Sequence, residues 1–180
     1  MRVLMRDWTP GPYERLWHRE LFGHHLLADD LRLGLYLGHL RPSYPGTDAL
    51  SLSVSPQVEL WLQQGLNPHL EWIFGEGQRL GTSKFLPILA QHVSLTVIHL
   101  VLDEASAAAR RDARIIAGDT KRWHGLEKPV SEQSIRARFS MVEKAARTCD
   151  EAGVPVVRLD ARQSPESIAA VISELVALDC

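Results

Sequence analysis

The sequence predicts an α/β fold in which helices cover both faces of a parallel sheet. From residue 70 onward, predicted strands and helices alternate in the order β-α-β-α-α-β-α, which is typical of parallel sheets. The clearest strand, residues 94–102, is nearly continuous in apolar and β-branched residues, which indicates a strand covered on both faces. The 180 residues, 45% of them hydrophobic, suffice for one domain with a substantial core and are few for two.

The first two elements are predicted from apolar spacing. A helix is expected over residues 12–28, because Tyr13, Leu16 and Trp17 would share one helical face. Residues 31–38 form a short apolar run with a tyrosine, which predicts a strand.

The later helices are predicted mainly from their first residues. A serine or aspartate before a helix accepts hydrogen bonds from its first N–H groups, and proline fits the first helical position. Helices are therefore expected from Ser55-Pro56, from Asp103 to about Ile116, from Ser131 or Ser134, and from Ser164-Pro165. A short helix near Phe85 and strands at 70–75 and 154–160 complete the series. The helix after Ser131 should turn one face inward: Ile135, Phe139, Val142 and Ala146.

Charge and composition exclude several classes of protein. The net charge is −2, which gives no global attraction to nucleic acid or membrane surfaces. No apolar run approaches the roughly 18–20 residues that span a bilayer. Cys149 and Cys180 lack metal-ligand spacing. Of the eight histidines, His24 and His25 would point about 100° apart on a helix, a poor metal pair, and His99 fits a buried core position.

A basic segment stands out against this balance. Residues 110–147 hold ten lysines and arginines but five acids, a local net charge of +5. This concentration indicates an anionic ligand, although a solvated helical surface explains it as well. Arginines can position a phosphoryl group and neutralise its charge. The candidates for this role are Arg110, Arg114, Arg122, Arg136 and Arg138.

Glu76 is the strongest catalytic candidate. It directly follows the predicted strand 70–75, and ligands of parallel sheets bind beyond the carboxyl ends of their strands. A carboxylate there can act in a Mg²⁺ shell or orient an attacking hydroxyl. Gly75 and Gly77 would let the backbone approach a ligand closely. The alternative is a solvated glutamate in a strand-end turn.

The loop 41–48 carries a second group of polar residues. Arg41 can pair with a phosphate, Thr47 can donate a hydrogen bond, and Asp48 can accept one from a hydroxyl or a base edge. We therefore expect Arg41, Thr47 and Asp48 to bind a substrate, with Asp48 as a second catalytic candidate. A proline-glycine turn whose aspartate bonds its own backbone is an equally good interpretation.

The segments "RPSYPGTDALSLSVSPQVELWL" and "IFGEGQRLGTSKFLPIL…VSLTVIHLVLDEASAAARRDAR" resemble P-loop nucleoside and nucleotide kinase-like proteins, more narrowly those of actinobacterial phages. The resemblance covers about residues 40–178. It implies a single three-layer αβα domain over residues 1–180 with a lid at about 110–140. It also implies ATP and Mg²⁺ as cofactors, with Glu76 near the metal, and a nucleotide, nucleoside or modified pyrimidine in DNA as acceptor. A phage protein of this kind would work in the host cytoplasm.

The chain departs from this family at one motif. Such kinases begin with a strand followed by G-x-x-x-x-G-K-[ST], whose backbone N–H groups and lysine hold the phosphates. This chain contains no Gly-Lys pair, and Gly81-Thr82-Ser83-Lys84 follows the wrong strand. Either the real start lies upstream or the protein is a divergent member that lost nucleotide binding. Without the central strand, we expect low stability or a sheet that closes differently.

Three functions follow from these observations. The leading one is ATP-dependent phosphotransfer. The second is a non-catalytic kinase-like module that recognises a nucleotide or a protein. The third, a DNA-binding accessory protein, depends on the basic helices alone.

Overall fold

The structure, a computed structural model, describes residues 9–17, 21–28, 31–40, 50–51, 53–64, 70–77, 79–116 and 131–178. Within these ranges the strands form two sheets, a four-stranded one in the order β1-β2-β3-β4 and a two-stranded one of β5 and β6. The predicted three-layer parallel αβα sheet is therefore wrong.

The four-stranded sheet is mixed. Its strands are β1 (Thr9–Trp17), β2 (Leu21–Ala28), β3 (Leu31–Leu37) and β4 (Trp72–Gly75). The first three pair antiparallel, and β4 pairs parallel to β3. Because β1, β2 and β3 follow one another through short links, they pair locally, and antiparallel pairing suits such links. The strand predicted over residues 31–38 is confirmed.

The helix predicted over residues 12–28 is wrong, because this segment forms β1 and β2. Pro10 lies in β1, which is the first strand in the sheet order, and proline is tolerated in edge strands because it has no N–H to pair. Gly23 lies where the backbones come close. A Cβ atom there would be 2.3 Å from the Tyr36 carbonyl oxygen and 2.7 Å from Leu16 Cδ1. Glycine at this position therefore favours the tight pairing of β2 with β3.

Helix α1 (Val54–Gln63) covers one face of this sheet. It buries Val54, Val58, Trp61 and Leu62, which share one face of the helix. Leu21, Leu35 and Leu37 of the sheet join them in the larger hydrophobic core. The helix starts slightly earlier than predicted, with Ser53 as its N-cap, while the Ser55 hydroxyl donates to the Arg79 carbonyl at 3.1 Å.

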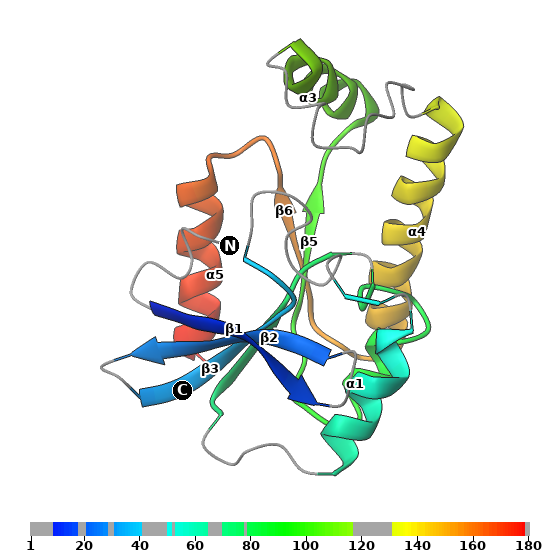
Figure 1. Ribbon diagram of the computed structural model, residues 1–180. Helices are drawn as coiled ribbons and strands as arrows, with labels where there is room; N and C mark the ends of the chain where they lie inside the picture. Colours follow the sequence, from blue (N-terminus) through cyan, green and yellow to red (C-terminus); the bar gives the residue numbers. More distant parts are fainter. Residues whose placement is uncertain are drawn as a thin grey trace.

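The second half of the chain follows the predicted order of elements. It contains α2 (Leu86–Leu89), β5 (Val97–Val101), α3 (Glu104–Ile116), α4 (Glu132–Glu151), β6 (Val156–Asp160) and α5 (Pro165–Leu178). Strands β5 and β6 are parallel, and α4 and α5 lie on opposite sides of them (Figure 1). Strand β5 is shorter than predicted, and its end is not covered, since Leu100 is 50% and Val101 43% exposed.

Three of the four predicted helix starts are confirmed by hydrogen bonds. The side chains of Asp103, Ser131 and Ser164 each accept from the backbone N–H three residues later, at 2.8, 3.2 and 3.1 Å. The predicted inner face of α4 is only partly correct. Its buried residues are Ala145, Ala146 and Cys149, whereas Val142 is exposed. Only the second half of α4 packs closely against β5 and β6.

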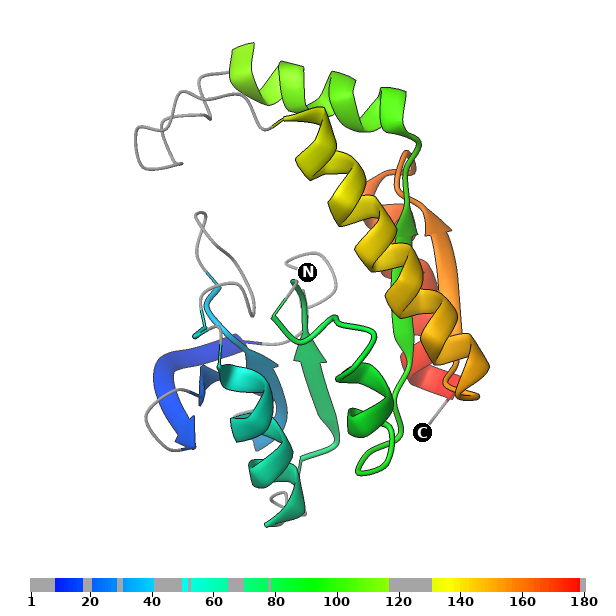
Figure 2. The same cartoon turned by 90° about the vertical axis from the view of Figure 1, so that its right-hand side faces the viewer.

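Helix α2 joins the two sheets. Phe85 and Ile88 belong to the core beneath α1, whereas Leu86 packs with Ala145 and Cys149 of α4. Leu89 contacts both cores. Figure 2 shows α2 between β4 and the β5–β6 pair, with β4, β5 and β6 running in the same direction.

Candidate functional site

The carboxyl ends of β4, β5 and β6 lie toward the same side of the molecule (Figure 2). Each is followed or closed by an acidic residue. Glu76 comes directly after β4, Asp103 comes two residues after β5, and Asp160 is the last residue of β6. Backbone N–H groups and polar side chains gather at such strand ends, which makes this side the best candidate for a ligand site.

Glu76 is held by a tyrosine that the sequence analysis did not single out. The Tyr36 hydroxyl donates a hydrogen bond to Glu76 Oε1 at 2.5 Å. Tyr36 is fully buried in β3, and Glu76 is half-buried. Gly77, the next residue, has φ of 111°, a left-handed conformation that favours glycine. The carboxylate is therefore fixed from the sheet, at a point where the chain itself turns.

Tyr36 belongs to a row of four ring side chains that crosses the sheet, one on each strand. Tyr13 of β1 lies opposite His24 of β2, His24 opposite Tyr36 of β3, and Tyr36 beside Phe74 of β4. We call these four residues the ring row. At its outer end Tyr13 stacks on His39, with ring centroids 4.2 Å apart. Side chains that are cross-strand neighbours support each other, so the row makes Tyr36 a rigid donor.

His24 connects the ring row to the end of β3. The Leu40 N–H donates to His24 Nε2 at 3.3 Å, so this nitrogen carries no proton. His24 Nδ1 is 2.8 Å from the Gly11 carbonyl oxygen and therefore carries the proton as donor. One neutral tautomer of His24 satisfies both partners.

Because His24 and His25 lie in a strand and not in a helix, they point to opposite faces of the sheet. His25 Nε2 lies 3.4 Å from Glu14 Oε1.

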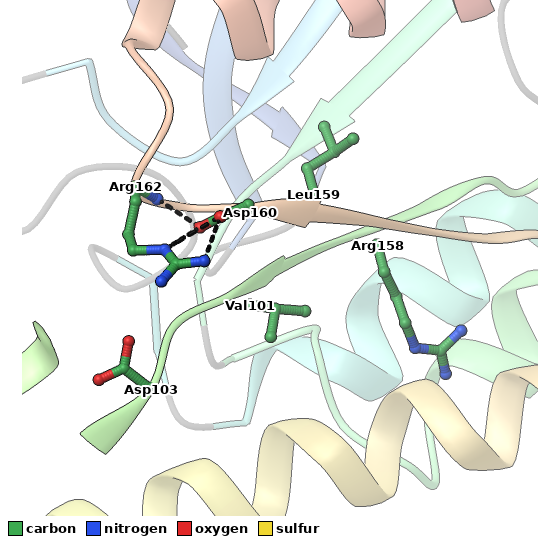
Figure 3. Close-up of a pocket in the computed structure, with 6 residues that line it drawn as sticks. All are labelled: Val101, Asp103, Arg158, Leu159, Asp160 and Arg162. Atoms are coloured by element: carbon green, nitrogen blue, oxygen red, sulfur yellow. Dashed lines mark hydrogen bonds and ion pairs between the residues drawn. The ribbon is translucent and has the colours of Figure 1, made fainter. Parts of the chain in front are cut away.

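A pocket of about 320 Å³ lies at the end of β5 and β6 (Figure 3). Its lining consists of Val101, Asp103, Arg158, Leu159, Asp160 and Arg162. In Figure 3 Arg162 folds back onto Asp160, and Arg158 extends toward α4, where it pairs with Asp150. The pocket thus offers an apolar floor and two guanidinium groups that already have carboxylate partners.

The acids of this pocket are stabilised as carboxylates. Hydrogen bonds from the Arg162 side chain, at 2.7–3.0 Å, lower the pKa of Asp160 to about 2. Hydrogen bonds from the hydroxyl and the N–H of Ser106 lower the pKa of Asp103. The partner Asp160 raises the pKa of Arg162. Both acids therefore stay ionised at neutral pH and can attract cations or accept hydrogen bonds.

The predicted phosphate-binding arginines do not form one cluster in the described part of the chain. Arg110 donates to the Ala161 carbonyl at 2.5 Å, which brings it beside the Asp160 turn. Arg136 pairs with Glu104 at 3.6 Å between Nε and Oε2, and Arg138 is exposed on α4. Arg114 lies in α3, but its side chain is outside the described residues. Arg122, Arg41, Thr47 and Asp48 also lie outside them.

Several residues of the site were missed at first. The segments "VLDE" and "RLDA" both place an aspartate at a strand end, as "FGEG" places Glu76. The rule that selected Glu76, an acidic residue at the carboxyl end of a strand, therefore also selects Asp160. It selects Asp103 as well, in addition to its role as a helix cap. The Tyr36–Glu76 contact gives no such signal, because its partners are 40 residues apart. The prediction that His99 is a buried core histidine is confirmed, with 7% exposure.

The donor set fits Mg²⁺ only together with a ligand. Within the described residues no group of three or more His, Cys, Asp or Glu side chains could enclose a metal ion. Mg²⁺, however, usually keeps several waters and takes one or two carboxylates plus substrate phosphates. Glu76 is compatible with that mode of binding.

Comparisons with known proteins give no relative for this chain. No protein-family model, no curated protein and no solved structure matches it. In the part of the chain that the structure describes, no helix is both long and apolar enough to cross a membrane.

Proposed function

We propose that the protein is an ATP-dependent phosphotransferase that acts on a nucleotide, a nucleoside or a modified pyrimidine in DNA. The observation that carries the proposal is Glu76, a carboxylate fixed by Tyr36 at the carboxyl end of a parallel strand. The likeness of the "PGTDALS" and "GEG-R" segments to phage kinase-like proteins supports the same reaction. Such an enzyme would work in the cytoplasm of the host cell.

Phosphoryl transfer requires mainly positioning and charge stabilisation. Glu76 would orient the acceptor hydroxyl and take its proton, or hold a water of the Mg²⁺ shell. Arg110 on α3 and Arg136 on α4 would exchange their present partners, the Ala161 carbonyl and Glu104, for the phosphates. ATP with Mg²⁺ would supply the phosphoryl group. The resemblance assigns acceptor contacts to Arg41, Thr47 and Asp48, and lid contacts also to Arg114, Arg122 and Arg138.

Transfer of the γ-phosphate is the direct test. The 180-residue chain, and any longer product of the same reading frame, is incubated with labelled ATP, Mg²⁺ and a panel of nucleosides, nucleotides and hydroxymethylated oligonucleotides. We expect one acceptor class to become labelled. Glu76→Gln should lower kcat by roughly 10²-fold or more, because the proton acceptor is lost. If Glu76 acts on the acceptor hydroxyl, ATP affinity by calorimetry should stay within about twofold, whereas a role in the Mg²⁺ shell should weaken binding of ATP with Mg²⁺. Absence of ATP binding in every form would refute the proposal.

A non-catalytic binding module is the second candidate. It is favoured by the pairing of the charged groups at the β5–β6 pocket, where Asp160 bonds Arg162 and Arg158 bonds Asp150. Carboxylates and guanidinium groups that are already paired with each other are better suited to ligand binding than to proton transfer. The absence of a Gly-Lys pair in the sequence points the same way. Nucleotide binding without label transfer to any acceptor would favour this candidate.

A further inference from the structure

We propose that Tyr36 is a positioning residue for Glu76, a role that rests on the proposed phosphotransferase function. The contact joins two strands that are distant in sequence, since Tyr36 lies in β3 and Glu76 follows β4. The donor is a phenol with no exposed surface, and its acceptor is half-buried at the strand end. A buried tyrosine hydroxyl needs a partner, and here the partner is the best catalytic candidate in the chain.

The backbone on either side of Glu76 consists of glycine. Glu76 stands between Gly75 and Gly77, and Gly77 adopts a left-handed φ of 111°. Glycines on both sides leave the backbone more freedom than any other residue would. The hydrogen bond from Tyr36 therefore restrains the carboxylate and holds Oε1 as an acceptor.

Tyr36 itself is held firmly. Its ring is fully buried, in a small core with Leu26, and Leu40 and Phe74 pack against that core. His24 and Phe74 are its cross-strand neighbours on either side. Because Tyr36 is rigid, its hydrogen bond also restrains the Glu76 carboxylate. A supporting residue of this kind keeps a reactive group in its productive geometry.

The test compares Tyr36→Phe with Glu76→Gln in the full chain. Phenylalanine keeps the ring and its packing but removes the donor. We expect Tyr36→Phe to lower kcat by about tenfold to a hundredfold, because a small misplacement of a catalytic group costs that much. KM for ATP and acceptor should stay within about twofold. The double variant should be no slower than Glu76→Gln alone, since both changes act through one carboxylate.

Two controls separate this role from a structural one. Tyr13→Phe removes the same atom from the same ring row, two strands away from Tyr36 in the sheet order, and kcat should stay within about twofold. The second control needs no activity. In protein labelled with ¹³C at the glutamate carboxyl groups, the Glu76 signal, assigned through Glu76→Gln, should shift in Tyr36→Phe and not in Tyr13→Phe.

The outcomes are distinct. An unchanged Glu76 signal in Tyr36→Phe would overturn the proposal whatever the activity. So would an unchanged kcat in Tyr36→Phe alongside a large loss in Glu76→Gln, although the proposed function would then stand. If the unaltered protein neither binds ATP nor labels any acceptor, the proposed function fails and the positioning role falls with it.

Discussion

The sheet β1–β4 and the pair β5–β6 both place carboxylates at the ends of parallel strands, yet they hold them in different ways. Glu76 is bonded to a tyrosine without exposed surface. Asp160 is bonded to Arg162, whose side chain is 66% exposed. Exposed ion pairs contribute little to stability and are screened by salt, whereas a buried donor keeps its geometry. The sheet β1–β4 therefore holds one carboxylate, Glu76, in a fixed position, whereas the β5–β6 pair presents a surface of paired charges.

The same contrast appears in how the two regions are built. The four-stranded sheet is dominated by local antiparallel pairing, and its ring row gives each strand one interlocking side chain. The β5–β6 pair joins segments separated by α3 and α4, with helices on both sides (Figure 1). We therefore expect the first region to tolerate substitutions at backbone contacts poorly, and the second to depend on its helices.

Gly23→Ala should have the largest effect on stability. The new Cβ atom would lie 2.3 Å from the Tyr36 carbonyl oxygen, a backbone atom that cannot move without breaking the β2–β3 pairing. We expect a loss of about 3 kcal/mol in the free energy of unfolding, the upper range for overpacking. Urea denaturation followed by tryptophan fluorescence measures it.

Gly153→Ala is the matched control in the second region. Gly153 has φ of +74°, but nothing lies within 4 Å of a Cβ atom there. Only backbone strain remains, and the expected loss is about 1 kcal/mol. Equal losses for the two glycines would contradict the tight pairing of β2 with β3.

Leu89→Ala should affect both regions at once, because Leu89 packs against both cores. We expect a loss of about 2 kcal/mol, the lower range for truncating a leucine, since Leu89 is only partly buried. Hydrogen exchange should quicken in β3 and in β5 together. Val58→Ala, which removes two methyl groups from the core beneath α1 alone, should quicken exchange first in β1–β4. Faster exchange in one region only for Leu89→Ala would argue against α2 as the link.

The sequence could predict the second region because its signals are local. Each helix start carries a capping residue within three positions of its partner, and the strand at 154–160 is bounded by a glycine and a Ser-Pro pair. The first region lacks such signals. Tyr13, Leu16 and Trp17 fit a helical face, and only the pairing of β1 with β2 and of β2 with β3 decides for strands. For the same reason Glu76 was predicted as a strand-end acid, but its partner Tyr36 was not.

Ser131→Ala tests the dependence of the second region on its helices. The Ser131 hydroxyl oxygen accepts from the Ser134 N–H at 3.2 Å and caps α4. Removing it should cost about 1 kcal/mol, whereas Ser131→Asp should restore most of that loss. Ser53 is the N-cap of α1, but its side chain makes no capping hydrogen bond. Ser53→Ala should therefore cost only a few tenths of about 1 kcal/mol. Thermal unfolding of the three variants measures the order, and a larger loss for Ser53→Ala would contradict it.

Asp160→Asn should have the smallest effect, a small loss of stability at neutral pH that disappears in acid. Arg162 lowers the pKa of Asp160 from an ordinary 3.8 to about 2 in the folded protein. The ion pair thus contributes stability that is fully present above the unfolded pKa and is lost as the pH falls toward 2. The stability of Asp160→Asn should therefore fall less steeply than that of the unaltered protein between about pH 4 and pH 2.

Arg162→Gln is the matched variant for this ion pair, because it removes the side-chain hydrogen bonds from the other side. It should flatten the acid dependence less than Asp160→Asn does, because the backbone N–H of residue 162 still donates to Asp160, and the double variant should match Asp160→Asn. Added salt should shrink the difference, since the guanidinium is exposed. Acid unfolding at low and high ionic strength measures both effects. If Arg162→Gln left the acid dependence unchanged, the carboxylate would owe its low pKa to another group, and the contrast between this exposed pair and Glu76 with its buried donor Tyr36 would lose its basis.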